Sequence, residues 1–192
     1  MASTPHLRSP DPVHRRQEWG TVTDNALGIE RAAAEQVVEA LNRDVSGLYL
    51  LFNQVRKHKW TVEGAEFELL KAFLADAADR LSTITDEVAV RVHALGGVPV
   101  CGPMGIRQYA PMDIEAAHRY DVRSSLARDL DGYATLVVGM REHIELAERV
   151  GDTATGELLR RHLPTLEADG DTLAKCLAGD TLVRRDVLGA RR

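Results

Sequence analysis

The sequence predicts an all-α protein: a four-helix bundle in which a long crossover, containing a short helix, joins the second helix to the third. Three observations favour this class. Apolar residues recur every three or four positions over long runs, which is the period of a helix face rather than of a strand. Ala, Leu, Glu and Arg, all common here, favour helices. A short link, a long link and a second short link separate the four runs.

The first helix is expected to begin near Asp24 or Asn25 and to end at about Lys57. Either residue can cap the helix, because its side-chain oxygen accepts a hydrogen bond from a free N–H group of the first turn. One apolar stripe should face the core, and it consists of Ile29, Ala33, Val37, Leu41, Val45, Leu48, Phe52 and Val55.

The second helix is expected after a short turn at residues 61–64. It should end at the Gly96–Gly97 pair, because glycine adopts positive φ after a helix and the nearby Pro99 cannot continue one. Its apolar positions also step by three or four: Phe67, Leu70, Phe73, Leu74, Ala77, Leu81, Ile84, Val88, Val92 and Leu95.

The crossover, residues 98–120, is expected to be irregular because Pro99, Pro103 and Pro111 interrupt it. One short helical turn is plausible near residues 104–109. A connection of this length in a compact domain is either functional or spans the length of a helix.

The third helix is expected from Val122 to shortly before Gly151, and the fourth from a cap at Asp152 or Thr153. Pro164 should kink the fourth helix, because proline lacks an N–H group and its ring clashes with the preceding turn. The long helices should each measure about 40 Å. Their links then give an up-down, down-up bundle of the ferritin-like kind.

We expect an N-terminal tail (1–23), the bundle (24–179) and a basic C-terminal tail (180–192). Prolines favour disorder in the first tail, whereas Trp19 favours docking against a surface groove, and both interpretations stay open. Two cysteines, Cys101 and Cys176, and the lack of a signal-like or membrane-spanning run favour a cytoplasmic protein. The net charge of −5 argues against a dedicated DNA-binding domain.

A specific motif runs through the first turn between helices. His58-Lys59-Trp60-Thr61-Val62-Glu63-Gly64 is similar to the His-His-Trp-x-Val-x-Gly run of the Dps-type miniferritins, the family of DNA protection during starvation. Phe67, the run Asp86-Glu87-Val88-Ala89, Arg91, the run Ala94-Leu95-Gly96-Gly97 and residues 151–159 also match. The resemblance spans about residues 29–178. It implies a dodecameric cage, built from twofold dimers, that stores iron and protects DNA under stress.

The resemblance also implies an iron-oxidising site between two subunits. Its five ligand positions fall on Lys59, Lys71, Ala75, Asp86 and Val90 of this chain, where the family has His, His, an acid, Asp and Glu. Four of the five ligands are therefore replaced, which leaves open whether the chain is an enzyme. Our hypothesis is that Lys59 and Lys71 neutralise the Asp86 of the partner subunit, as a structural ion pair.

A relocated iron site is the alternative. His58 neighbours the family's site and could recruit Asp76 or Asp79. No His-x-x-x-His pair is present, and the expected long helices carry no Glu-x-x-His pair of the kind that bundles use for di-iron sites. Each of the other histidines is therefore expected to be solvated or hydrogen-bonded.

Two further sets of residues have functional and ordinary interpretations. The family places acidic pores near the fourth helix, which here would use Glu148, Asp152 and Glu157, although carboxylates also cap helices. Terminal arginines could hold DNA phosphates without sequence preference, or could simply keep the protein soluble. They are Arg8, Arg15, Arg16, Arg184, Arg185, Arg191 and Arg192.

Three functions follow from these interpretations. The first is an iron-mineralising cage with a weak or relocated oxidation site. The second is a non-catalytic cage that compacts the nucleoid or forms mixed shells with an active relative. The third is a ferritin-like bundle that binds some other ligand and forms no cage.

Overall fold

The computed structural model describes residues 14–113 and 115–179. Its helices form the expected all-α, ferritin-like arrangement, with no strand in that part of the chain. In chain order they are α1 (Arg31–Thr61), α2 (Phe67–Ala94), α3 (Pro103–Tyr109), α4 (Val122–Arg149) and α5 (Thr153–Leu177).

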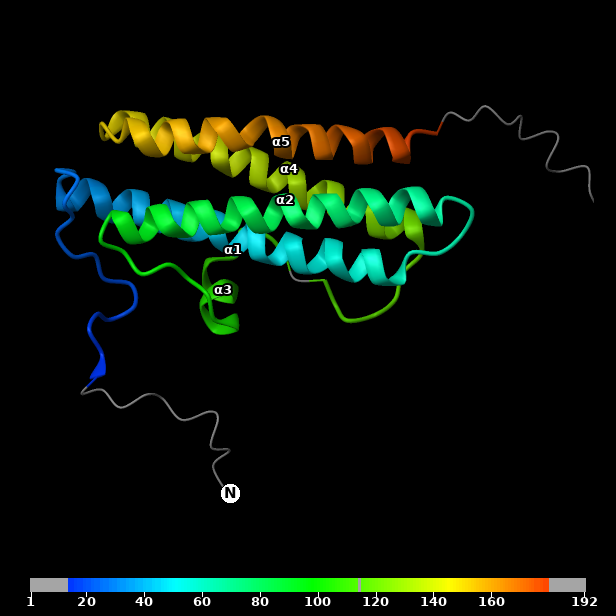
Figure 1. The fold of residues 1–192 in the computed structure, drawn as a ribbon, viewed down its shortest axis with the longest axis horizontal. Coiled ribbons are helices and arrows are strands. Elements are labelled where there is room, and N and C mark those ends of the chain that lie inside the picture. Colours follow the sequence, from blue (N-terminus) through cyan, green and yellow to red (C-terminus); the bar gives the residue numbers. More distant parts are fainter. Residues whose placement is uncertain (1–13, 114, 180–192) are drawn as a thin grey trace, which may run out of the picture.

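The four long helices run side by side, and the crossover spans the bundle from one end to the other (Figure 1). α1 and α2 form one antiparallel pair, and α4 and α5 form the other. α1 also packs on α4, while the short α3 lies outside the bundle against α1. The up-down, down-up order predicted from the link lengths is confirmed.

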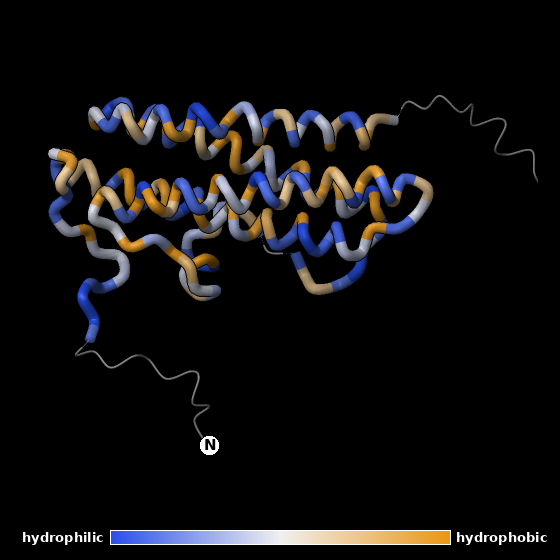
Figure 2. Tube along the Cα trace, viewed as in Figure 1, coloured by the Kyte–Doolittle hydropathy of each residue, from blue (hydrophilic) through white to orange (hydrophobic). Residues whose placement is uncertain are grey.

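The core is a continuous apolar cluster to which all four long helices contribute. Apolar and polar residues follow one another along each helix, as amphipathic helices require (Figure 2). Its largest fully buried side chains are Tyr133, Leu41, Leu48, Leu51, Leu74, Leu81, Leu95, Leu136, Met140, Leu159, Leu166 and Leu173. Every position in the apolar stripe predicted for α2 is buried or partly buried, so the predicted face is the one that meets the core.

Helix ends agree with the sequence better for α2, α4 and α5 than for α1. The predicted cap of α1 is wrong: the helix starts at Arg31, and the N-cap residue is Glu30. Asn25 instead closes a turn, because its Oδ1 accepts hydrogen bonds from the N–H groups of Leu27 and Ile29. Asp152 does cap α5, and the helix continues through Pro164 without ending there.

The end of the N-terminal segment docks on the bundle, as Trp19 suggested. The Trp19 ring meets Tyr109 of α3 edge-on, with 5.4 Å between ring centroids. The Thr23 N–H donates to the carbonyl of Gly96 at 2.9 Å, and the Gln17 side-chain amide donates to the same oxygen at 2.8 Å. Val22 is buried beneath this contact.

Two remaining observations concern the chain as a whole. Cys101 and Cys176 are both free and exposed. Among the described residues, none of the helices combines the length and the apolar character needed to cross a lipid bilayer.

Gly96 should be required for the docking of residues 17–23. Its φ is +83°, and an added Cβ would overlap the Thr23 carbonyl oxygen. We expect Gly96→Ala to lower the free energy of unfolding by about 1–3 kcal/mol, because the strained backbone and the clash both have to be relieved. Chemical denaturation followed by circular dichroism measures this change.

Gly139→Ala is the matched control. Gly139 lies inside α4, where the nearest side-chain atom to an added Cβ is 3.9 Å away. We expect this variant to be unchanged or stabilised by up to about 1 kcal/mol, since alanine favours a helix more than glycine does. Equal stability of the Gly96 variant and the wild type would contradict the role given to Gly96.

Candidate functional site

The positions that the resemblance assigns to iron oxidation lie on α1 and α2. Lys59, in the last turn of α1, is half-buried. Lys71, early in α2, is exposed, and its Nζ lies 5.0 Å from the centre of the Phe67 ring. Asp86 is exposed farther along α2. Within the described part of the chain, none of these three charged groups forms an ion pair.

The residues at these positions do not fit a di-iron centre. A protonated lysine has no lone pair to give to a metal, and its charge repels Fe²⁺. The two other positions carry Ala75 and Val90, which have no ligating atom, and Val90 is 70% exposed. Only Asp86 offers a carboxylate, and one carboxylate does not make a di-iron site.

The relocated iron site is a wrong prediction for His58. Its side chain is buried and turned toward α4, where it contacts Asp129 rather than Asp76 or Asp79. Both of those aspartates are exposed on α2. Across residues 14–113 and 115–179 there is no group of three or more His, Cys, Asp or Glu side chains arranged to hold a metal ion.

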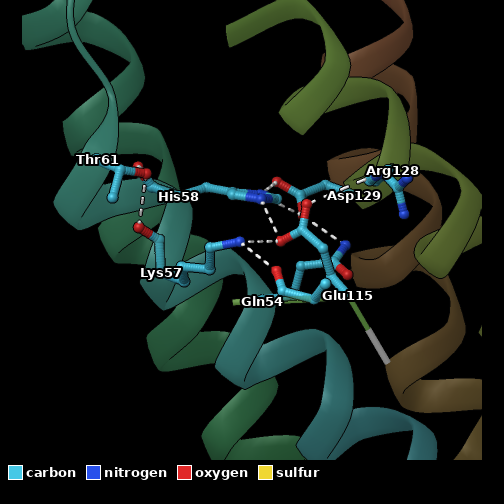
Figure 3. A network of polar contacts seen from close by, with 8 residues as sticks. Gln54, Lys57, His58, Thr61, Glu115, Arg128 and Asp129 are labelled. Atoms are coloured by element: carbon cyan, nitrogen blue, oxygen red, sulfur yellow. Dashed lines mark hydrogen bonds and ion pairs between the residues drawn. The ribbon is translucent and has the colours of Figure 1, made fainter. Parts of the chain in front are cut away.

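His58 instead belongs to a buried polar network between α1, α4 and the crossover (Figure 3). Its Nδ1 lies 2.8 and 2.9 Å from the two carboxylate oxygens of Asp129, and its Nε2 lies 3.0 Å from Oε2 of Glu115. Lys57 Nζ donates to that same Glu115 oxygen at 2.6 Å. Gln54 donates to Asp129 at 2.9 Å.

The charges of this network depend on one another. Burial alone would lower the pKa of His58, but the hydrogen bond and charge of Asp129, with the charge of Glu115, raise it above its ordinary value. Burial raises the pKa of Asp129, and His58 and Gln54 only partly offset that effect. The shift of His58 favours its protonated, charged form, whereas the shift of Asp129 shows that burial makes its carboxylate costly and dependent on these partners.

A second buried polar group joins α2, α4 and α5. The guanidinium of Arg80 makes two hydrogen bonds to Asp169, at 2.6 and 3.1 Å. The hydroxyl of Tyr133, which is 1% exposed, lies 3.3 Å from the same carboxylate. Burial is the main reason that the pKa of Tyr133 is raised far above its ordinary value, so this hydroxyl stays protonated and donates.

The three acidic residues expected at a pore differ in their surroundings. Asp152 is 1% exposed and turned into the bundle end, where it accepts hydrogen bonds from Arg91 at 2.5 Å and from the N–H of Thr155 at 3.1 Å. The pore prediction is therefore wrong for Asp152, because its carboxylate is already used as a helix cap and ion pair. Glu157 is exposed, and Glu148 pairs with Arg160.

Only two of the arginines expected to contact DNA lie in the described part of the chain. Arg15 and Arg16 are exposed, and Arg15 pairs with Glu18 at 3.2 Å. They precede the docked residues 17–23, so their backbone attachment is fixed near the end of α2. The other arginines, Arg8, Arg184, Arg185, Arg191 and Arg192, fall outside the described residues.

The chain is similar to known proteins over most of its length. The family model for a ferritin-like domain matches residues 38–182. The DNA protection during starvation protein of Halobacterium salinarum is 44% identical over 164 residues, which cover 85% of this chain and 90% of the relative. The chain belongs to the Dps type of the ferritin-like family.

Solved structures agree with this placement. The crystal structure of the Halobacterium salinarum Dps homologue covers 91% of this Dps-type chain and 97% of its own, with 43% identity and a TM-score of 0.87. DpsC from Streptomyces coelicolor is 26% identical, with a TM-score of 0.86 over 88% of this chain and 99% of its own. A Synechococcus protein described as a nutrient stress-induced DNA-binding protein is 31% identical over 86% of the chain and 94% of the relative.

Apart from His58, the residues of the two buried polar groups of this Dps-type chain were not among the candidate site residues singled out from the sequence. Asp129 lies three residues after Leu126 and Asp169 three after Leu166, so each occupies a core-facing position of its helix. A charged residue in an apolar stripe was the available signal. It indicates a buried partner, but it does not say which residue that partner is.

Asp152 should contribute to folding rather than to a pore. We expect Asp152→Ala to lower the free energy of unfolding by about 3 kcal/mol, because it removes the cap of α5 and leaves the partly buried guanidinium of Arg91 without its carboxylate partner. The exposed Glu157 provides the control, and Glu157→Ala should change stability by less than about 0.5 kcal/mol. Urea denaturation of both variants measures the difference, and equal stabilities would show that Asp152 has no structural role.

Proposed function

We propose that this chain is the subunit of a Dps-type cage that stores iron and protects DNA under stress. The carrying observation is the match to the Halobacterium salinarum Dps homologue, which includes nearly the whole of both chains at 43% identity. A relative from Vibrio cholerae, 25% identical with a TM-score of 0.76 over 84% of this chain and 99% of its own, is described as a ferritin-like diiron-carboxylate protein. Iron is the cargo in this proposal.

The cage would be a dodecamer in which pairs of subunits meet across a twofold axis through α1 and α2. Three large apolar residues of these helices support a covered surface: Trp60, Leu69 and Val90 are 67%, 75% and 70% exposed in the single chain. A contiguous exposed apolar patch marks an interaction surface, and the proposal requires that these side chains of α1 and α2 be covered by the neighbouring copy. The guanidinium of Arg56 lies 5.1 Å from the centres of both the Phe52 and Trp60 rings, which holds Trp60 in place.

Lys59 and Lys71 would neutralise the Asp86 of the partner subunit in this interface. None of the three groups is engaged in an ion pair within residues 14–113 and 115–179, so each has charge available for a neighbouring copy. Such a pair fixes the register of an interface more reliably than it adds stability. The twofold position would then be structural, and the cage would depend on other carboxylates, such as those of Glu148 and Glu157, to draw iron in.

A non-catalytic cage is the second candidate, and the residues at the twofold position favour it. Four of the five positions carry a protonated lysine or an apolar side chain, and neither binds a metal. The subunit would then need an active relative in a mixed shell to oxidise iron. Alternatively, it would act by compacting the nucleoid. The exposed Arg15 and Arg16 suit DNA phosphates. Arg8 and the C-terminal arginines are further candidates for the same contact.

Restoring two imidazoles should distinguish these functions. With the full-length protein first sized by light scattering, we expect the wild type to oxidise Fe²⁺ no faster than buffer. The double variant Lys59→His, Lys71→His should be faster by roughly tenfold or more, because it supplies two imidazoles beside Asp86. The initial rate of Fe²⁺ oxidation by oxygen or peroxide is the measurement.

Lys175→His is the control for that experiment, because it places an imidazole on the exposed surface of α5. It should leave the rate at the wild-type level. A wild type as fast as the double variant would place iron oxidation elsewhere in the protein. Anomalous scattering from iron-soaked crystals that located iron beside Asp86 would exclude the structural ion pair, and a monomer or dimer in solution would exclude the cage.

DNA binding should be sequence-independent and sensitive to salt. We expect the double variant Arg15→Gln, Arg16→Gln to bind duplex DNA more weakly. Each arginine–phosphate pair that the variant removes should make the slope of log affinity against log salt shallower by about 0.9. Gel shifts at several salt concentrations measure both effects. Arg43→Gln, which changes an exposed arginine of α1, should leave them unaltered, and an equal loss in both variants would argue against a role for residues 15 and 16.

A further inference from the structure

His58 has a carboxylate at each of its two ring nitrogens. Nδ1 faces Asp129 at 2.8 Å, and Nε2 faces Glu115 at 3.0 Å. An ionised carboxylate only accepts hydrogen bonds, so both nitrogens must carry a proton for both hydrogen bonds to form. The neutral ring has a single N–H, and its other nitrogen would then present a lone pair to a carboxylate oxygen.

The two carboxylates differ in how firmly they are held. Asp129 lies in the middle of α4, is fully buried, and also accepts a hydrogen bond from Gln54 at 2.9 Å. Glu115 lies on the irregular crossover between α3 and α4. Its Oε2 also accepts a hydrogen bond from Lys57 at 2.6 Å, but its Oε1 has no hydrogen-bond partner and lies 3.9 Å from the guanidinium of Arg128. A neutral His58 would therefore keep its hydrogen bond to Asp129 and give up the one to Glu115.

We propose that His58, Lys57 and Glu115 form a proton-controlled clasp that fastens the crossover to the bundle and loosens when the imidazolium of His58 loses its proton. The clasp joins the crossover, which comes from between α3 and α4, to the last turns of α1 (Figure 3). Two crossover residues close to Glu115, Met112 and Asp113, line a pocket together with Gln54, Arg128 and Gly132. Loosening the clasp would move this part of the crossover.

The charged or titratable groups near His58 come from α1, the crossover and α4. α1 supplies Lys57, the crossover supplies Glu115 and Tyr120, and α4 supplies Asp129 and Arg128. α2 contributes Leu74, which carries no charge. The Tyr120 ring lies between Lys57 and Arg128, at 4.9 and 5.3 Å from its centre, so the end of the crossover nearest α4 keeps a second attachment when Glu115 is released.

The direction of the pH effect follows from the geometry and agrees with the raised pKa of His58. Because that pKa is raised in the folded protein, the clasp is closed at lower pH and its stabilisation is lost as pH rises through the raised value. The contact between His58 and Glu115 is therefore expected to break as the pH becomes alkaline.

Hydrogen–deuterium exchange of the full-length protein, followed by mass spectrometry, tests the clasp. The exchange of peptides covering residues 110–121 is divided by the intrinsic rate at each pH. In the wild type we expect this ratio to rise by roughly tenfold between about pH 6 and about pH 9, because one charge-assisted hydrogen bond is broken.

Two variants should abolish the pH dependence in opposite ways. His58→Gln has no positive charge and carries both of its N–H donors on one atom, so it cannot replace the two ring nitrogens that face Asp129 and Glu115. The crossover of this variant should therefore exchange fast at both pH values. Glu115→Gln should keep it protected at both, because the amide can donate to the lone pair of a neutral His58. If His58 and Glu115 only packed against each other, the two variants would not change the exchange of the crossover in opposite directions. If His58→Gln does not fold, the Glu115→Gln variant alone still tests the proposal.

His162→Gln is the control, since His162 pairs with Glu87 on α2 at 3.0 Å and does not touch the crossover. It should keep the wild-type profile of residues 110–121. The proposal is overturned if the wild-type ratio does not change with pH, if His58→Gln keeps the wild-type profile, or if Glu115→Gln opens as the wild type does.

Discussion

One imidazole ring holds together parts of this chain that lie far apart in the sequence. His58 is at the end of α1, Asp129 is in α4, and Glu115 lies on the crossover between them. Charged groups in a core are costly unless each finds a partner, and here each carboxylate finds the same ring. The part of the crossover that carries Glu115 is held against α1 and α4 by this contact.

The same region of α1 carries two different kinds of chemistry on adjacent residues. His58 points inward and is almost fully buried, whereas Lys59 is half-buried and has no ion pair within the described residues. One residue corresponds to about 100° around a helix, which is why neighbours in the sequence serve different surfaces. The family's ligand pattern is thus altered on one face, while the buried face carries an ion-pair network in which His58, Asp129 and Glu115 are already paired with one another.

Periodicity was sufficient to predict the fold, because the apolar stripes of four helices and the lengths of three links restrict the topology to very few choices. The start of α1 was missed because Asn25 uses its side chain in a turn instead of a cap. The polar network was missed for another reason. Lys57 and Glu115 are 58 residues apart, and an irregular segment has no period from which the inward direction of Glu115 could be inferred. Asp152 could be predicted as a cap from its position before α5. Its ion pair with Arg91 could not, because that pair depends on how the end of α2 packs against the start of α5.

The docking of the N-terminal segment sets a geometric limit on anything that precedes it. Gln17 and Thr23 both donate hydrogen bonds to the carbonyl of Gly96, so the chain that precedes them is attached to the bundle at this point. Arg15 and Arg16 come directly before Gln17. A fully extended chain covers at most about 3.4 Å per residue, so the backbone of Arg15 stays within about 7 Å of the backbone of Gln17. In an assembly of many copies, these two arginines could reach only phosphates that pass close to this end of their own subunit.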